Sequence, residues 1–349
     1  MTPAAKVVIC NKCNKQYSVA KYAAIIRCTE CKVIIPGPAS VELGHQIRHA
    51  LSKTKSTLHQ SFGNGGNSGE AHGMKRALLC GVTYRDKTYS LKGTVNDVKR
   101  MKVLLMQRFG YRRDCIRILT ETGSESDFSP TKKNIQESLK WLVEGSESGD
   151  SLVFYFSGHG LRQPDFNDDE KDGFDETICP VDFMQEGMIL DNEINSTIVR
   201  PLKKGITLHA IVDACHSGTV LDLEYVYDLP KDIWIDNKPP SKADKSTSGG
   251  LAICLSACGD DEMASDTSAF TGKDMTGAMT FILIHVVENV PEITYGSLLD
   301  QMHEVIEQVN YKRCLTVPCL RILLGRRKIE NPMLSSSQEF PVYSKKFLL

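Results

Sequence analysis

The sequence lacks a hydrophobic run long enough to cross a lipid bilayer. A membrane-spanning helix needs about 20 mostly apolar residues in a row, and the longest candidate, residues 278–287, is too short and contains His285. We therefore expect no membrane span and no membrane partner. The N-terminal segment also lacks the apolar core of a signal peptide. This absence predicts a location in the cytoplasm, with the nucleus as a second compartment.

The sequence also has almost no net charge. Its 42 Lys and Arg residues nearly balance its 43 Asp and Glu residues, which gives a formal charge of −1. Because no overall field is present to attract a polyanion, we expect no nucleic-acid partner. Internal repeats are absent as well. The hydrophobic content of 41% is ordinary for globular proteins. A length of 349 residues predicts one large domain plus a small module, or two domains, and we expect a monomer.

Cysteines, in contrast, are plentiful. With no leader in view, twelve cysteines indicate metal ligands, a nucleophile and buried thiols rather than a disulfide framework. Cys10, Cys13, Cys28 and Cys31 form two CxxC pairs separated by fourteen residues. This spacing predicts a zinc ribbon over residues 1–35, in which the structural Zn²⁺ serves as the core. DNA binding by this module is the alternative, but few basic residues lie near the pairs.

The rest of the chain predicts a flexible linker followed by one α/β domain. Residues 36–75 are rich in Gly, Pro, Ser and His and cannot bury enough apolar area to fold. Residues 76–349 then alternate between strands and helices, which predicts a three-layer sandwich with a mostly parallel central sheet. A second polar stretch, residues 229–249, is expected to be an exposed linker that divides this domain into a large segment (76–228) and a small segment (250–349).

The elements expected in this domain are defined by apolar runs and by helical periodicity. Strands are predicted at residues 76–84, 115–120, 151–157, 178–181, 208–214 and 251–257, and helices at residues 94–109, 276–289 and 295–310, after the N-cap Thr131, and near Asp191. Cys80, Cys115, Cys179 and Cys254 fall on predicted strands and are expected in the core.

The two most apolar predicted strands both run into glycine-rich, polar sequences. One continues into Ser157, His159 and Gly160, and the other into Asp213 and Cys215. Because functional residues gather at the carboxyl ends of parallel strands, a histidine and a cysteine there indicate nucleophilic catalysis by a thiolate with an imidazole base. The amide of Gly160, with that of Cys215, is the candidate donor to an oxyanion. Taken singly, a hydrogen-bonded surface histidine and a buried thiol remain the alternatives.

These two motifs resemble the active-site motifs of metacaspases, the caspase-like cysteine peptidases of plants, fungi and protists. Similarity extends to residues 91–97, 270–272, 276–279 and 336–343, and the cysteine module resembles the lesion-simulating-disease type of zinc finger found in plant type I members. The resemblance implies a self-processed, zymogen-derived cysteine endopeptidase linked to programmed cell death or stress responses. It also implies partners among zinc-finger cell-death regulators, although residues 17–24 depart from the family pattern.

The same resemblance implies cleavage after Arg or Lys. The positions that match the S1 pocket of the family are Asp97, Asp213 and Ser157. Two carboxylates can bind a guanidinium through charge-assisted, bidentate hydrogen bonds. For Asp97 the alternative is a first-turn carboxylate that complements the helix dipole.

An acidic stretch, residues 165–176, does not fit an EF-hand in either possible frame. Read without the family, it is a solvated acidic loop. The resemblance to metacaspases instead implies an activating Ca²⁺ site at Asp175, Asp191, Asn192 and Asp222. Asn192 stands where aspartate is usual; its amide oxygen still suits Ca²⁺, with one negative charge fewer.

Four lysines in the predicted linker, Lys231, Lys238, Lys242 and Lys245, are candidate self-processing sites for a protease that cleaves after basic residues. Exposed linkers contain lysine in any case, so no single site is favoured. The rival function is a catalytically weak adaptor that recruits cell-death regulators through its zinc finger.

Overall fold

The computed structural model describes the following residues: 5–9, 14–20, 25–27, 30, 34–36, 73–121, 128–167, 169–215, 217–238, 241, 243–257, 266–267, 276–311 and 329–349. The chain divides into two compact units, Met1–Glu70 and Ala71–Leu349. In the first unit, β1 (Ala5–Ile9) pairs antiparallel with β2 (Gln16–Ala20), and β3 (Ile25–Arg27) with β4 (Ile34–Pro36). The cysteines of the predicted zinc ribbon lie outside the described residues.

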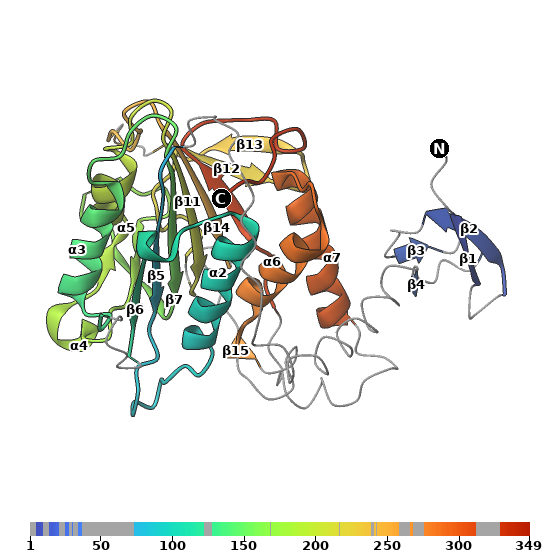
Figure 1. Ribbon diagram of the computed structural model, residues 1–349, viewed down its shortest axis with the longest axis horizontal. Helices are drawn as coiled ribbons and strands as arrows, with labels where there is room; N and C mark the ends of the chain where they lie inside the picture. The colour runs from blue at the N-terminus through green and yellow to red at the C-terminus, as the bar shows by residue number, and fades with distance from the viewer. Residues whose placement is uncertain are drawn as a thin grey trace. The chain divides into compact units, whose positions relative to one another are not determined.

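The second unit contains an eight-stranded sheet in the order β13-β12-β17-β14-β11-β7-β5-β6 (Figure 1). The five strands from β14 to β6 are parallel, and β17, β12 and β13 extend the sheet by antiparallel pairing. The bounds are β5 Lys75–Gly81, β6 Ile116–Thr120, β7 Ser151–Ser157, β11 Thr207–Asp213, β12 Tyr225–Asp228, β13 Ile233–Asp236, β14 Leu251–Ser256 and β17 Met333–Ser336. The central strands β7, β11 and β14 are almost wholly buried, as expected when helices cover both faces of a parallel sheet.

Helices pack on both faces of this sheet (Figure 1). The helices on one face are α2 Thr94–Arg108, α6 Ala278–Asn289 and α7 Tyr295–Tyr311, and those on the other are α3 Lys132–Val143, α5 Asp191–Ile194 and the π-helical turn η2 Asn195–Val199. The three-layer α/β fold with a mostly parallel sheet is thus confirmed. No helix among the described residues is long and apolar enough to span a membrane.

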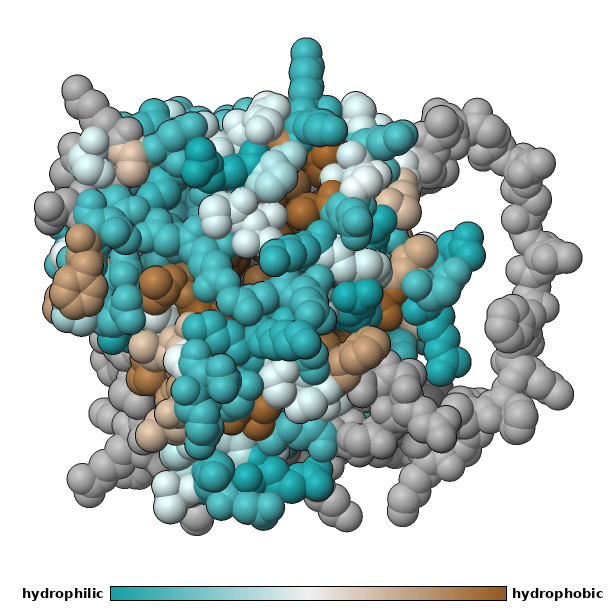
Figure 2. Space-filling model, turned by 90° about the vertical axis from the view of Figure 1, so that its left-hand side faces the viewer, coloured by the Kyte–Doolittle hydropathy of each residue, from teal (hydrophilic) through white to brown (hydrophobic). Residues whose placement is uncertain are grey.

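Helix α3 shows how local sequence sets these elements. The Thr131 hydroxyl accepts a hydrogen bond from the Asn134 backbone amide, so Thr131 is the N-cap, as predicted. Ile135, Leu139 and Leu142 recur at helical spacing and are buried. The outer face is correspondingly hydrophilic: Figure 2 views the molecule from the side that carries α3 and shows mostly hydrophilic residues, with small hydrophobic spots between them.

Three local expectations differ from the structure. The strand expected at residues 178–181 lies earlier, as β9 (Phe174–Ile178), which pairs with β8 (Gly160–Pro164) and β10 (Ile189–Leu190) in a small antiparallel sheet. Cys115 is only half-buried because it ends a short 3-10 turn, η1 (Arg113–Cys115), just before β6.

The predicted linker, residues 229–249, is the third difference, because it is not wholly exposed. Its first part forms β13, the outer strand of a hairpin with β12. The Trp234 ring packs against Tyr227 and Phe340, and its indole N–H donates to the Phe340 carbonyl oxygen. The sequence could not predict this, since Phe340 lies more than a hundred residues away.

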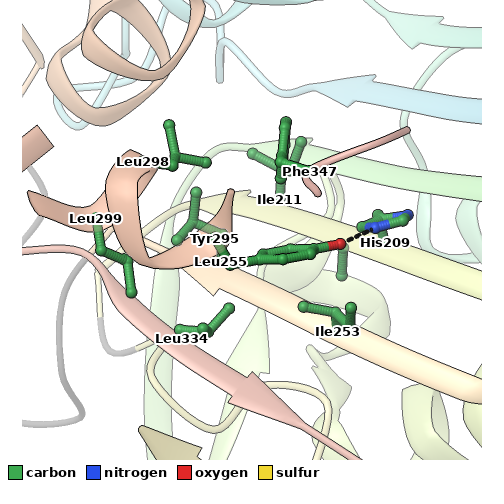
Figure 3. Close-up of a pocket in the computed structure, with 10 residues that line it drawn as sticks. His209, Ile211, Ile253, Leu255, Tyr295, Leu298, Leu299, Leu334 and Phe347 are labelled. Atoms are coloured by element: carbon green, nitrogen blue, oxygen red, sulfur yellow. Dashed lines mark hydrogen bonds between the residues drawn. The ribbon is translucent and has the colours of Figure 1, made fainter. Parts of the chain in front are cut away.

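A small cavity lies between the sheet and α7 (Figure 3). Its walls are aliphatic and aromatic apart from a buried hydrogen bond between the His209 ring and the Tyr295 hydroxyl. None of the predicted site residues lines it, so it belongs to the core.

Candidate active site

The ends of β7 and β11 bring the predicted catalytic pair to one place. The two strands are parallel neighbours in a register that sets Ser157 beside Asp213. His159 and Cys215 each follow two residues later, so both leave the sheet at the same edge. The backbones touch there: a Cβ placed on Gly160 would lie 2.0 Å from the Cys215 carbonyl oxygen, an approach that only glycine permits.

The imidazole of His159 is held by a backbone acceptor. Its Nε2 lies 2.6 Å from the carbonyl oxygen of Tyr89. Because a carbonyl oxygen can only accept, Nε2 carries the proton of the neutral ring. The basic nitrogen is therefore Nδ1, which can take a proton from a thiol.

Two tyrosines that the sequence did not single out surround this histidine. The Tyr84 ring lies 4.7 Å from the His159 ring, centroid to centroid, at an interplanar angle of 32°. Its hydroxyl accepts the His159 backbone N–H at 2.9 Å and donates to the Cys179 carbonyl oxygen at 2.6 Å. Tyr89 and Phe183 pack edge-on beside them. Tyr84 also takes a φ of 51°, a conformation that non-glycine residues rarely adopt and that clusters at functional sites.

The three predicted substrate-binding residues also come together. Asp97, on the first turn of α2, accepts a hydrogen bond from the Ser157 hydroxyl at 3.4 Å. Asp213 ends β11, and both carboxylates are buried. Burial, together with the charges of Asp97 and Asp213, holds the pKa of Tyr155 well above its usual range. Both carboxyl groups therefore act on the same buried tyrosine.

The start of α6 lies directly against these two carboxylates. The Gly277 amide donates to Asp97 Oδ2 at 2.8 Å, and a Cβ on Gly277 would lie 2.2 Å from Asp213 Oδ2. Thr280 donates to Asp213 Oδ2 through its amide at 2.9 Å and through its hydroxyl at 2.6 Å. The sequence did not predict this contact, which links the large segment to the small one.

The four residues matched to calcium lie in a buried acidic cluster. We define the acidic cluster as Asp165, Asp169, Glu170, Asp175, Asp191, Asn192 and Asp222. Carboxylate oxygens of Asp165, Asp169 and Asp175 lie within 4.8 Å of one another, as do those of Glu170, Asp175 and Asp191. Burial, and next the charge of Asp222, raises the pKa of Asp191 to about 9 and that of Glu170 to about 10. Such carboxyl groups need a cation in order to ionise.

Asp175 supplies the observation that bears most directly on a metal. Its side chain is 1% exposed, its Oδ2 accepts from Gln163 at 3.1 Å, and its Oδ1 has no hydrogen-bond partner among the described residues. An orphaned carboxylate oxygen inside a group of oxygens fits a hard cation such as Ca²⁺. Sequence reasoning found four of these residues and missed Asp165, Asp169 and Glu170 as members of the cluster.

An ammonium group already lies in the acidic cluster. Lys245 Nζ is 2.7 Å from Asp169 Oδ2, 2.7 Å from Asp222 Oδ2, 2.6 Å from Asn192 Oδ1 and 3.2 Å from Glu170 Oε1. With a side chain only 7% exposed, Lys245 is not an accessible cleavage site in this structure. Lys231 and Lys238 are exposed, and Lys242 lies outside the described residues.

Comparison with known proteins identifies the family. A profile of the metacaspase peptidase C14 domain matches residues 75–224. Metacaspase-1 of Arabidopsis thaliana is 41% identical over 98% of this chain and 96% of its own length. The chain belongs to the metacaspase family. Metacaspase-3 of the same plant is 46% identical over 79% of this metacaspase and 76% of its own length. Metacaspase-1 of the yeast Meyerozyma guilliermondii is 34% identical over 78% of this chain and 77% of its own length.

Among solved structures, protein GSU0716 from Geobacter sulfurreducens superposes with a TM-score of 0.50. It is 19% identical in sequence and is matched over 78% of this chain and 97% of its own, which shows a shared fold. Family membership makes this metacaspase a caspase-like cysteine peptidase, and its substrates are proteins.

Three other described cysteines differ from Cys215 in their surroundings. Cys80, Cys179 and Cys254 are buried, as predicted, and burial raises the pKa of Cys179 and of Cys254 to about 12. These thiols stay protonated and cannot act as nucleophiles at neutral pH. Cys215 is partly exposed and lies at the sheet edge beside His159.

Proposed function

We propose that this metacaspase cleaves proteins after Arg or Lys through a dyad of His159 and Cys215. The observation that carries the proposal is the hydrogen bond from His159 Nε2 to the Tyr89 carbonyl oxygen, at the strand edge that Cys215 shares. That bond leaves Nδ1 to take the thiol proton. The thiolate attacks the scissile carbonyl carbon, and the imidazolium then gives its proton to the leaving amine. Water, with His159 as base, hydrolyses the acyl-enzyme, while the amides of Gly160 and Cys215 stabilise the oxyanion.

The preference for a basic residue is supported by the two buried carboxylates, Asp97 and Asp213. The guanidinium or ammonium group of a basic substrate side chain would compensate both negative charges and would also contact the Ser157 hydroxyl. In this structure the Gly277 amide and Thr280 donate hydrogen bonds to these carboxylates. We propose that the start of α6 shifts when a basic side chain binds.

We further propose two metal roles. The acidic cluster would hold an activating Ca²⁺, with Asp175, Asp191, Asn192 and Asp222 as ligands, and would fix the segment around residues 165–176 when the ion is bound. Cys10, Cys13, Cys28 and Cys31 would hold a structural Zn²⁺. Through that module the protein would bind zinc-finger regulators and act in cell death or stress responses in the cytoplasm and nucleus.

The test uses wild type and Cys215→Ala with fluorogenic peptides that end in Arg, Lys or Asp, each with Ca²⁺ or with EGTA. We expect wild type to cleave the Arg and Lys peptides only with Ca²⁺, and Cys215→Ala to cleave none. Cleavage of the Asp peptide alone would overturn the substrate preference, and full activity in EGTA would remove the calcium role. Equal behaviour of the two proteins would favour the adaptor.

A further inference from the structure

Lys245 is a linker residue whose ammonium group is buried in the acidic cluster. An ammonium has three N–H donors, and four side-chain oxygens lie within 3.2 Å of it. Three of these oxygens belong to carboxyl groups, those of Asp169, Glu170 and Asp222. The ammonium therefore acts as a cation that the chain itself supplies.

Lys245 and a divalent cation would compete for the same oxygens. Asp222 Oδ2 and Asn192 Oδ1, which bond the ammonium, belong to two of the proposed Ca²⁺ ligands. Ca²⁺ binds oxygens at about 2.3–2.6 Å, so the ion and the ammonium cannot both occupy this position. The ammonium of Lys245 contacts one part of the cluster, namely Asp169, Glu170, Asn192 and Asp222. The buried Oδ1 of Asp175, which has no hydrogen-bond partner among the described residues, marks a place that a cation would fill.

The position of Lys245 in the chain links this competition to the linker. Its backbone carbonyl accepts from Asn195 Nδ2 at 3.2 Å, and the same amide group donates to the carbonyl oxygens of Leu221 and Asp222. Three residues later Ser248 is fixed to the Arg200 carbonyl oxygen. The ammonium contacts of Lys245, together with these backbone and Ser248 contacts, thus hold this end of the linker against the large segment.

We propose that Lys245 is the resident cation of the acidic cluster, and that Ca²⁺ binds there by displacing it and so exposes the linker around Lys245 to cleavage. The inference rests on the proposed function, since it gives a mechanism to Ca²⁺ activation. It assigns Lys245 a role before cleavage that an ordinary exposed linker lysine does not have. The acidic cluster has Asn192 where the family usually has an aspartate. Occupation by Lys245 explains how such a cluster stays without Ca²⁺ until the Ca²⁺ concentration rises.

The first experiment measures Ca²⁺ binding by calorimetry on the full chain in a Cys215→Ala background, so that self-cleavage cannot interfere. Removing the competing charge with Lys245→Met is expected to tighten Ca²⁺ binding by at least about tenfold, because the free site becomes fully populated. Lys245→Arg, which keeps the charge, is the matched control and is expected to bind no tighter than the parent. Lys245→Gln serves the same purpose if the methionine variant fails to fold.

Each binding result decides the question. If removal of the charge leaves Ca²⁺ affinity unchanged, the two cations do not compete and the proposal is wrong, while Ca²⁺ activation stands. If no variant binds Ca²⁺, both Ca²⁺ activation and the displacement of Lys245 are wrong. The peptidase activity is tested separately, by the peptide cleavage experiment described above.

The second experiment measures exposure of Lys245 itself. The Cys215→Ala protein is treated with trypsin, and fragments that begin at Ser246 are quantified by mass spectrometry. Ca²⁺ is expected to increase this fragment at least about fivefold over EGTA or Mg²⁺, while cleavage after the exposed Lys231 serves as the internal reference. Asp175→Asn, which removes a proposed ligand without touching Lys245, should abolish the increase. Equal cleavage after Lys245 with and without Ca²⁺ would overturn the displacement.

Discussion

Tyr84 and His159 form one structural unit: their rings are in tilted contact with centroids 4.7 Å apart, and the Tyr84 hydroxyl accepts the His159 backbone N–H. The same hydroxyl donates to the Cys179 carbonyl oxygen, so it bridges two chain segments beside the catalytic edge. The histidine is therefore positioned from three directions, by the Tyr84 ring, by the Tyr84 hydroxyl and by the Tyr89 carbonyl oxygen.

Tyr84→Phe tests this unit. It keeps the aromatic ring against His159 and removes the hydroxyl that bonds the His159 amide and the Cys179 carbonyl. We expect kcat to fall about tenfold with KM nearly unchanged, and the free energy of unfolding to fall by about 1–3 kcal/mol. Steady-state kinetics and urea unfolding measure both. Tyr89→Phe is the control, because Tyr89 holds the imidazole through its backbone oxygen; an equal loss of kcat there would contradict the positioning role of the Tyr84 hydroxyl.

Asp213→Asn tests the proposed preference for Arg or Lys before the cleaved bond. It removes one of two buried carboxylates and keeps the shape of the side chain. We expect kcat/KM for Arg and Lys peptides to fall by at least about a hundredfold, because a buried charge-assisted pair is lost. The matched control is Asp86→Asn, an exposed carboxylate in a turn, which should leave kcat/KM unchanged. Unaltered cleavage of Arg peptides by Asp213→Asn would show that this carboxylate does not recognise the substrate.

Much of the fold could be predicted from the sequence because its signals are local. The apolar runs that end at Ser157 and Asp213 predicted the central strands, and Thr131 predicted the start of a helix. Parallel strands then had to present His159 and Cys215 at one edge. No distant contact was needed for this inference.

The parts of the site that could not be predicted depend on distant or backbone contacts. The acceptor of His159 is a backbone carbonyl, which has no side-chain signature. Lys245 reads as a solvated linker residue, yet its partner Glu170 lies 75 positions away. Gly277 reads as a helix start, and only the folded chain places it against Asp97 and Asp213.

Acid stability should depend on His209, which is buried against Tyr295. Burial, and next the charges of Lys345 and Lys75, lowers its pKa from 6.5 to about 3. Between these values the unfolded chain binds a proton that the folded chain does not, so stability is complete above pH 6.5 and is lost as pH falls toward 3. One pKa unit corresponds to about 1.4 kcal/mol. Between pH 6.5 and 4.5 we expect His209 to account for a loss of about 2 kcal/mol.

The measurement is urea unfolding of wild type, His209→Gln and Tyr295→Phe at several pH values. Both variants lose the bond between these side chains, but only the first loses the titrating ring. We expect the pH dependence to flatten in His209→Gln and to persist in Tyr295→Phe. Parallel curves for all three proteins would show that His209 does not carry the acid sensitivity.

Gly160 tests how closely the two strand ends that carry the proposed dyad must approach. A Cβ at this position would lie 2.0 Å from the Cys215 carbonyl oxygen and 3.2 Å from that of Thr177. Both neighbours are backbone atoms, so Gly160→Ala must separate the segment that carries His159 from the one that carries Cys215. A displacement of about 1 Å can cost about a hundredfold in rate, and we expect kcat to fall by at least that factor, with a lower Tm. Leu161→Ala, at the exposed next position, should keep kcat within about threefold, since surface substitutions are usually mild. An active Gly160→Ala enzyme would mean that the dyad tolerates a wider gap between its strand ends than this contact implies.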